Sequence, residues 1–261
     1  MIQTRMISSL AVGLALFAAA APLAAQQVTP GRLAVEANAK EDVNGACRVS
    51  FVVGNGLEEN LYKLSFEAVV MDTAGEAAQF TLLEFTEVPQ GAVRVKQFDL
   101  RGRACDDVGQ VIVNRTLTCE AVGLDPQACA QNLDVASRIS TPDVTEGQIS
   151  VELNRLESFE GSCRLTFVTR NGLSQPLGGM MAETALFDTN GGLSRLTVFE
   201  LGDVAAGQTR VRRYEVTGSA CDGLGNVLVN DWQSCTVEGT EAGACTAAIN
   251  VTSRTAIGLL Q

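Results

Sequence analysis

Cysteine is the reactive residue type whose number and spacing in this sequence indicate a specific chemistry. Eight cysteines could form disulfide bonds or hold metal ions, and they fall into two sets of four with the same gaps of 58, 14 and 10 residues. The sets are Cys47, Cys105, Cys119 and Cys129, followed by Cys163, Cys221, Cys235 and Cys245. Zinc sites built from cysteine normally contain closely spaced C-x-x-C pairs, and this chain has none. The spacing therefore favours disulfide bonds over metal ligands.

Other catalytic designs find little support in the composition. The chain has no histidine, which excludes Ser-His-Asp triads, Cys-His dyads and histidine-ligated metals. Its three lysines, Lys40, Lys63 and Lys96, do not stand in an S-x-x-K motif. Asp72 and Asp188 precede glycines, a pattern that favours Asx turns over a calcium loop. We expect a protein without cofactor or metal that is not an enzyme, with a hydrolase based on paired carboxylates as an alternative.

Basic residues gather at one place in each half of the chain. The net charge is −11, so a local positive concentration could bind an anionic ligand or an acidic partner. The alternative is an exposed strand whose cations pair with acids such as Glu67 and Glu183. The candidate ligand-binding residues are Arg94, Lys96, Arg210, Arg212 and Arg213. The overall acidity argues against nucleic acid as a partner.

The cysteine sets belong to a longer internal repeat with an offset of 116 residues. Gly45–Leu57 matches Gly161–Leu173, and Ala104–Asn114 matches Ala220–Asn230. The period is too long for a solenoid repeat and suits a tandem duplication of a complete domain. We expect a first repeat at 26–138, a linker at 139–147 and a second repeat at 148–261.

The N-terminus has the pattern of an export signal. Arg5 precedes an apolar run at 10–21, and small residues end it at Ala24-Ala25, which predicts a signal peptide at 1–25. No later segment could cross a bilayer, so we expect no transmembrane anchor. An exported chain, periplasmic or extracellular, enters an oxidising compartment, where eight cysteines indicate four disulfide bonds.

Short β-branched and aromatic runs separated by turn residues predict an all-β fold. Each repeat should form an antiparallel β-sandwich of immunoglobulin-like type, with a small closed barrel as the alternative. The strands expected in the first repeat are 33–37, 47–53, 61–71, 80–85, 93–100 and 111–117. Asn114 and Asn230 follow Val-x-Val runs and are expected at turns or strand edges.

Strand order also suggests how the cysteines pair. If strands alternate in direction, Cys47 opens the second strand at the end where the fifth strand finishes, close to Cys105. Cys119 then lies at the opposite end, close in sequence to Cys129. We expect Cys47–Cys105, Cys119–Cys129, Cys163–Cys221 and Cys235–Cys245, although sequence alone allows three connectivities in each repeat.

The segments 180–192 and 203–216 resemble bacterial extracytoplasmic domains of the FxLYD type. Leu186-Phe187-Asp188 stands in for the Leu-Tyr-Asp motif, and Val70-Met71-Asp72 does so in the first repeat. The chain is also similar to secreted proteins of alphaproteobacteria. The resemblance implies an immunoglobulin-like sandwich and no activity. We expect a secreted or periplasmic protein that is an interaction or envelope structural module with a protein partner, or, alternatively, a binder of small anionic ligands.

Overall fold

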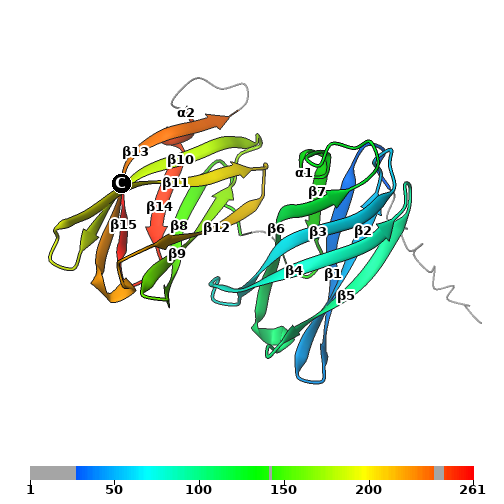
Figure 1. Ribbon diagram of the computed structural model, residues 1–261, viewed down its shortest axis with the longest axis horizontal. Coiled ribbons are helices and arrows are strands. Elements are labelled where there is room, and N and C mark those ends of the chain that lie inside the picture. Colours follow the sequence, from blue (N-terminus) through cyan, green and yellow to red (C-terminus); the bar gives the residue numbers. More distant parts are fainter. Residues whose placement is uncertain (1–27, 141–142, 238–243) are drawn as a thin grey trace, which may run out of the picture.

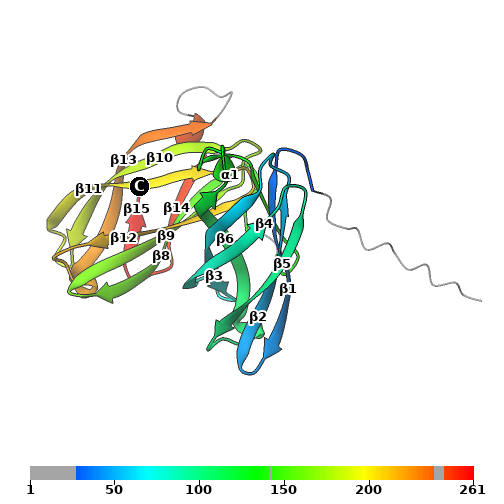
Figure 2. The ribbon, with the colours of Figure 1, turned by 45° about the vertical axis from the view of Figure 1, so that its right-hand side comes forward.

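The computed structural model describes residues 28–140, 143–237 and 244–261, so the expected signal peptide at 1–25 lies outside the described residues. The chain forms two β-sandwiches side by side (Figures 1 and 2), each with its own buried core. None of the helices in the described ranges is long and apolar enough to span a membrane. The all-β sandwich prediction is confirmed.

The N-terminal sandwich consists of a four-stranded and a three-stranded sheet, in the orders β5-β2-β1-β7 and β4-β3-β6. Strand β2 pairs antiparallel with β1 and β5, strand β3 pairs antiparallel with β4 and β6, and β7 joins β1 in parallel. Its strands are β1 (Leu33–Val43), β2 (Ala46–Asn55), β3 (Leu61–Asp72), β4 (Ala77–Val88), β5 (Val93–Arg101), β6 (Val108–Glu120) and β7 (Leu133–Ser137).

The C-terminal sandwich repeats this arrangement in sheets of order β12-β9-β8-β14 and β11-β10-β13-β15. The strand β15 has no counterpart among the described strands of the first sandwich and pairs in parallel with β13. The strands are β8 (Ile149–Phe159), β9 (Ser162–Asn171), β10 (Leu177–Asp188), β11 (Leu193–Val204), β12 (Thr209–Val216), β13 (Leu224–Val237), β14 (Ile249–Ser253) and β15 (Gly258–Leu260). Strands β5 and β12 therefore occupy equivalent edges.

Alternation along the strands places one face of each sheet in the core. In β2, Cys47, Val49, Phe51 and Val53 are all buried in the N-terminal core, as the sequence pattern predicts. Strand β3 differs, because it is buried on both faces over much of its length. Its second face contacts the other sandwich, so β3 lies where the two sandwiches meet.

All eight cysteines form disulfide bonds, with the pairing expected from strand order. The bonds are Cys47–Cys105, Cys119–Cys129, Cys163–Cys221 and Cys235–Cys245. Cys105 and Cys221 each begin a 3-10 turn, Cys105–Asp107 and Cys221–Gly223, whereas Cys129 and Cys245 lie on the short helices α1 (Ala128–Gln131) and α2 (Ala244–Ala247). The bonds thus tie connecting segments to strands rather than sheet to sheet.

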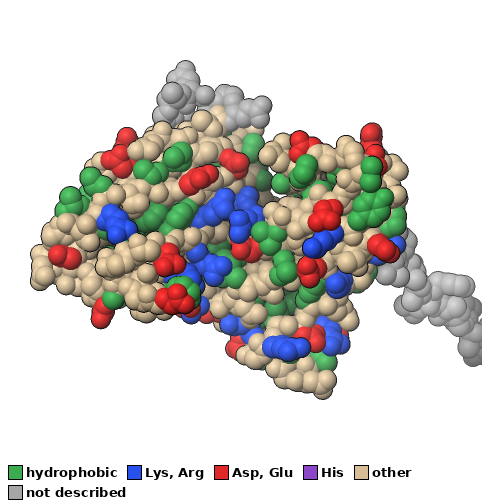
Figure 3. Space-filling model, viewed as in Figure 1, with side chains coloured by type: hydrophobic (Ala, Val, Ile, Leu, Met, Phe, Trp, Pro, Cys, Tyr) green, Lys and Arg blue, Asp and Glu red, His purple; other side chains and the backbone are tan. Residues whose placement is uncertain are grey.

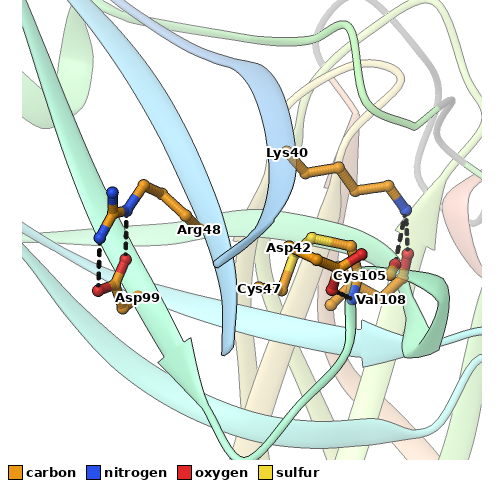
Figure 4. The surroundings of a disulfide bond; sticks show 7 residues. All are labelled: Lys40, Asp42, Cys47, Arg48, Asp99, Cys105 and Val108. Carbon is orange, nitrogen blue, oxygen red and sulfur yellow. Dashed lines mark hydrogen bonds and ion pairs between the residues drawn. A yellow bond between two sulfur atoms is a disulfide. The ribbon is translucent and has the colours of Figure 1, made fainter. Parts of the chain in front are cut away.

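The surroundings of Cys47–Cys105 show how the long bridge is held (Figure 4). Asp42 accepts a 2.8 Å hydrogen bond from the Cys105 amide, and Lys40 Nζ donates to the carbonyls of Cys105 and Val108 at 2.9 and 2.8 Å. Two polar side chains of β1 therefore satisfy the backbone of the turn that carries Cys105.

Candidate functional site

The two sandwiches meet through a small apolar cluster. Val69, Met71, Ala77 and Ile112 of the N-terminal sandwich pack with Val168 and Val211 of the C-terminal one, and all six are buried. Phe80 of β4 packs against the same cluster and is partly exposed. The outer face of the sheet β4-β3-β6 is therefore covered by residues of β9 and the edge strand β12.

Asn114 supplies the polar centre of this contact. Its amide nitrogen donates to the Val211 carbonyl at 2.9 Å, and its amide oxygen accepts from the Val211 amide at 2.9 Å. Both backbone groups of an edge-strand residue thus find partners in one side chain, as they would in a neighbouring strand. Glu67 holds the Asn114 amide in place by accepting a further hydrogen bond of 2.7 Å.

The expectation that Asn114 ends a strand or lies in a turn is wrong. Asn114 lies in the middle of β6 and is only 3% exposed. Sequence reasoning missed it because an Asn after a Val-x-Val run usually signals a turn. The need of the β12 edge for a hydrogen-bonding partner becomes visible only when the two sandwiches are placed together.

The arginine side chain of Arg210 also contributes to the contact around this centre. Arg210 donates to the carbonyl of Asn114 and, at 3.1 Å, to that of Asp203. Burial, and then the neighbouring charge of Arg212, lower the pKa of Arg210 to about 10. A cation held in this way between two backbone carbonyls has a structural role in the contact.

The turn between β3 and β4 is held by the C-terminal sandwich. Asn154 accepts from the Ala77 amide at 2.8 Å and donates to the Gly75 carbonyl at 2.9 Å. Arg254 donates to the Ala74 carbonyl. Arg155 forms an ion pair of 3.4 Å with Glu76. The turn is therefore recognised mainly through its backbone.

These contacts define two complementary surfaces. The sheet surface belongs to the N-terminal sandwich and consists of Val69, Met71, Ala77, Phe80, Ile112 and Asn114, with the adjoining turn Ala74–Gly75. The edge surface belongs to the C-terminal sandwich and consists of Asn154, Val168, Arg210, Val211 and Arg254.

A cleft of about 480 Å³ opens beside the contact. Figure 3 shows Lys and Arg side chains gathered along the middle of the molecule, where the two sandwiches meet. The cleft is lined by Glu67, Phe80, Arg115, Arg164, Glu200, Val211, Arg212, Arg213, Tyr214 and Glu215. Four arginines and three glutamates therefore face a space large enough for a small ligand.

The arginines of the cleft differ in how they are held. Arg213 stacks on the Phe80 ring at 3.6 Å, and partial burial lowers its pKa. Arg115 pairs with Glu67 at 3.3 Å. The Nε of Arg212 is buried and has no hydrogen-bond partner among the described residues.

The candidate basic residues separate into two groups. Arg210, Arg212 and Arg213 lie together at the junction, whereas Arg94 and Lys96 are exposed on β5 and line neither the cleft nor the contact. Lys96 donates to the Glu84 carbonyl at 2.7 Å.

Two of the four cleft arginines were not predicted. Arg115 and Arg164 come from β6 and β9, and no local charge cluster marks them in the sequence.

The two aspartates considered for calcium have a local role. Asp188 accepts from the amides of Asn190 and Gly192 at 2.8 Å each, and Asp72 accepts from the Glu76 amide at 2.8 Å. Their carboxylates therefore hold Asx-type turns. In the described ranges, no group of three or more potential ligand side chains is placed to hold a metal ion.

Comparisons with known proteins carry no argument about this chain. No family model matches the chain, and no curated protein matches it. Among solved structures, a transglutaminase of red sea bream aligns over 88% of this chain and 31% of its own, with 14% identity and a TM-score of 0.25. The chain thus spans about a third of that enzyme, and a likeness at this level carries no argument about activity.

Proposed function

We propose that this protein is an exported, non-enzymatic interaction or structural module of the cell envelope. The observation that supports it most is the contact between Asn114 and both backbone groups of Val211. It is a specific means of docking an edge strand, and recognition of strand edges is a general mode of protein binding. Four disulfide bonds suit a protein of an oxidising compartment outside the cytoplasm.

Exposed apolar side chains offer surfaces on which a partner could dock. Val95 on β5 is 64% exposed and Leu196 on β11 is 62% exposed, and apolar side chains at strand edges and on sheet faces are typical of interaction sites.

The test is site-specific photocrosslinking in the native envelope. A benzoylphenylalanine at position 95 or 196 should capture a discrete protein band, whereas the same group at Val122, an equally exposed loop position, should not. Absence of a specific band at both positions would overturn the proposal. So would hydrolysis of an ester, glycoside or peptide panel that a single Asp or Glu substitution abolishes.

A second candidate function is the binding of a small anion in the cleft, and the four arginines that line the cleft are the observation that favours it. Inorganic phosphate, sulfate and dicarboxylates would be screened for a rise in melting temperature. An Arg212→Ala variant should lose the rise, and Arg101→Ala, an exposed arginine outside the cleft, should keep it. A rise that both variants retain would exclude the cleft.

A further inference from the structure

The contact between the sandwiches is not symmetric, and this has a consequence for the repeat. The N-terminal sandwich uses its sheet surface, and the C-terminal sandwich uses its edge surface. Each sandwich has both kinds of surface, because the two repeats are related by a constant offset of 116 residues. One surface of each kind is therefore left over: a free sheet surface on the C-terminal sandwich and a free edge surface on the N-terminal one.

The free sheet surface retains the apolar character of the one in use. Ala185, Phe187, Leu193, Leu196 and Leu228 stand where the first sandwich has Val69, Met71, Ala77, Phe80 and Ile112. Leu193 is 59% exposed, whereas its counterpart Ala77 is 2% exposed. Strand β15 extends this sheet and ends in Leu260, which is 48% exposed. Leu193 and Leu196 are thus the exposed part of this apolar sheet face, on which Ala185 is buried and Phe187 and Leu228 are half-buried.

The polar centre of the contact recurs on the same free surface. Asn230 is the counterpart of Asn114, and its amide is held by a 2.7 Å hydrogen bond to Glu183, as Asn114 is held by Glu67 at 2.7 Å. Asn230 is exposed, whereas Asn114 is buried. The amide that docks an edge strand is therefore already oriented on the free surface.

The turn of the free sheet surface is also uncovered. Gly75 and its counterpart Gly191 have matching backbone φ of 82° and 79°. A β-carbon added at Gly75 would lie 3.2 Å from the guanidinium of Arg254, whereas one added at Gly191 would meet nothing within 4 Å. The second turn keeps the shape that the edge surface recognises and has no arginine on it.

The free edge surface carries the matching residues of the edge strand. Val52, Arg94 and Val95 occupy the positions of Val168, Arg210 and Val211. Val95 pairs with Val52 across β5 and β2 in the register in which Val211 pairs with Val168. The exposed fraction of Val95 is 64%, against 1% for Val211. Edge strand β5 therefore offers the residue that an Asn amide would bind.

The remaining donors keep their local support as well. Glu36 accepts hydrogen bonds from Asn38 and Arg138, just as Glu152 accepts from Asn154 and Arg254. Asn38 and Arg138 are thus positioned like the two side chains that hold the turn in the existing contact.

Two features of the existing contact are not repeated. Ala39 and Gly192 replace Arg155 and Glu76, which removes the ion pair, and Gln97 and Leu196 replace Arg213 and Phe80, which removes the cation–π stack. The apolar cluster and the backbone-directed hydrogen bonds are the parts that persist.

We propose that the free sheet surface of one molecule binds the free edge surface of a second copy, repeating between molecules the contact seen within one. The inference rests on the proposed interaction role and names the partner. Such a contact is heterologous, so it is open to continued addition and builds head-to-tail chains rather than a closed dimer. Between molecules it lacks the effective concentration of about 1 mM that a short linker supplies, so assembly depends steeply on protein concentration.

The test is sedimentation velocity of the exported, disulfide-bonded protein up to about 1 mM. The native sequence should form species that grow beyond two copies as concentration rises. Leu196→Asp should block the sheet surface and Val95→Asp the edge surface, and each variant alone should remain a monomer. Both positions are exposed, so neither change should disturb the fold. Asn230→Ala, which adds no charge, should weaken assembly at least tenfold.

Mixing the two blocked variants gives the decisive result. Together they retain one intact surface of each kind, so an equimolar mixture should form complexes of two copies and no larger ones. Val122→Asp, on an exposed loop outside both surfaces, should assemble like the native sequence. The proposal would be overturned if the native protein stayed a monomer at about 1 mM or assembled no further than two copies. It would also be overturned if Val122→Asp reduced assembly as much as the two blocked variants do. Crosslinks from positions 95 and 196 to a different protein, with a monomeric native chain, would sustain the interaction role and overturn self-assembly alone.

Discussion

Replacing Asn114 by alanine should open the contact between the sandwiches. The side chain is the partner of both the Val211 amide and the Val211 carbonyl, at 2.9 Å each, and Val211 is 1% exposed. A buried polar group that loses its partner costs about 1–3 kcal/mol. Two such groups give about 2–6 kcal/mol, and entry of water into the gap favours the lower half of that range.

Hydrogen exchange at the Val211 amide measures this loss directly. A cost of about 3 kcal/mol corresponds to a loss of protection of more than a hundredfold at that amide. The melting temperature should fall by several degrees, since about 1 kcal/mol shifts it by roughly 2–4 °C in a protein of this size.

The chain contains its own control for this experiment. Asn230→Ala removes the equivalent side chain from the other sandwich, where it is exposed and bonds to Glu183. At dilute concentration its effect on stability should stay within about 0.5 kcal/mol. If both variants lose the same stability, or if Val211 stays protected in Asn114→Ala, then Asn114 does not hold the sandwiches together.

Three further results are expected. Removing the Cys47–Cys105 bridge by a double alanine substitution should lower the free energy of unfolding by about 4 kcal/mol, and removing Cys119–Cys129 should lower it by about 3 kcal/mol, because the bridges close loops of 58 and 10 residues. Denaturant titration measures both losses, and a larger loss for the short bridge would contradict the loop-entropy argument. Arg32 lowers the pKa of Asp134 below its usual 3.8, so the stability that this pair contributes is present above pH 3.8 and is lost as pH falls through the lowered pKa. In a measurement of stability against pH, Arg32→Ala should abolish this acid-dependent loss. Burial raises the pKa of Tyr214 to about 12, so between pH 10 and about pH 12 only the unfolded chain releases the phenol proton and stability falls with rising pH. Ultraviolet titration should show a phenol that ionises near the raised pKa, and Tyr214→Phe should remove that ionisation.

Strand positions and disulfide partners could be predicted from the sequence because they depend on local pattern and strand order. Alternation at 47–53 marks the core face of β2, and the opposite directions of the second and fifth strands place Cys47 and Cys105 at the same end of the sandwich. The observed strands extend beyond the predicted runs, as β1 does by reaching Val43, because backbone pairing continues through residues with polar side chains.

The surfaces between the sandwiches could not be predicted in the same way. Val69 and Met71 look like ordinary strand residues, and their burial depends on a partner more than 90 positions away in the sequence, Val168 or Val211. The basic residues of β12 were predicted to bind a ligand, yet Arg210 binds the backbone carbonyls of Asn114 and Asp203. Charge clustering shows that arginines are near one another, whereas their partners follow from how the domains dock.

The position of the long disulfide bonds has a mechanical consequence. Each sandwich has its first cysteine near the start of its second strand and bonds it to a cysteine 58 residues later. A pulling force along the chain would bypass everything inside that loop, which withholds about 200 Å of contour length in each sandwich. Under tension each sandwich would lengthen only through the residues that lie outside its bridged loops. An oxidised chain of this kind is therefore a shorter tether than a reduced one, because reduction would release the contour length that the bridges withhold.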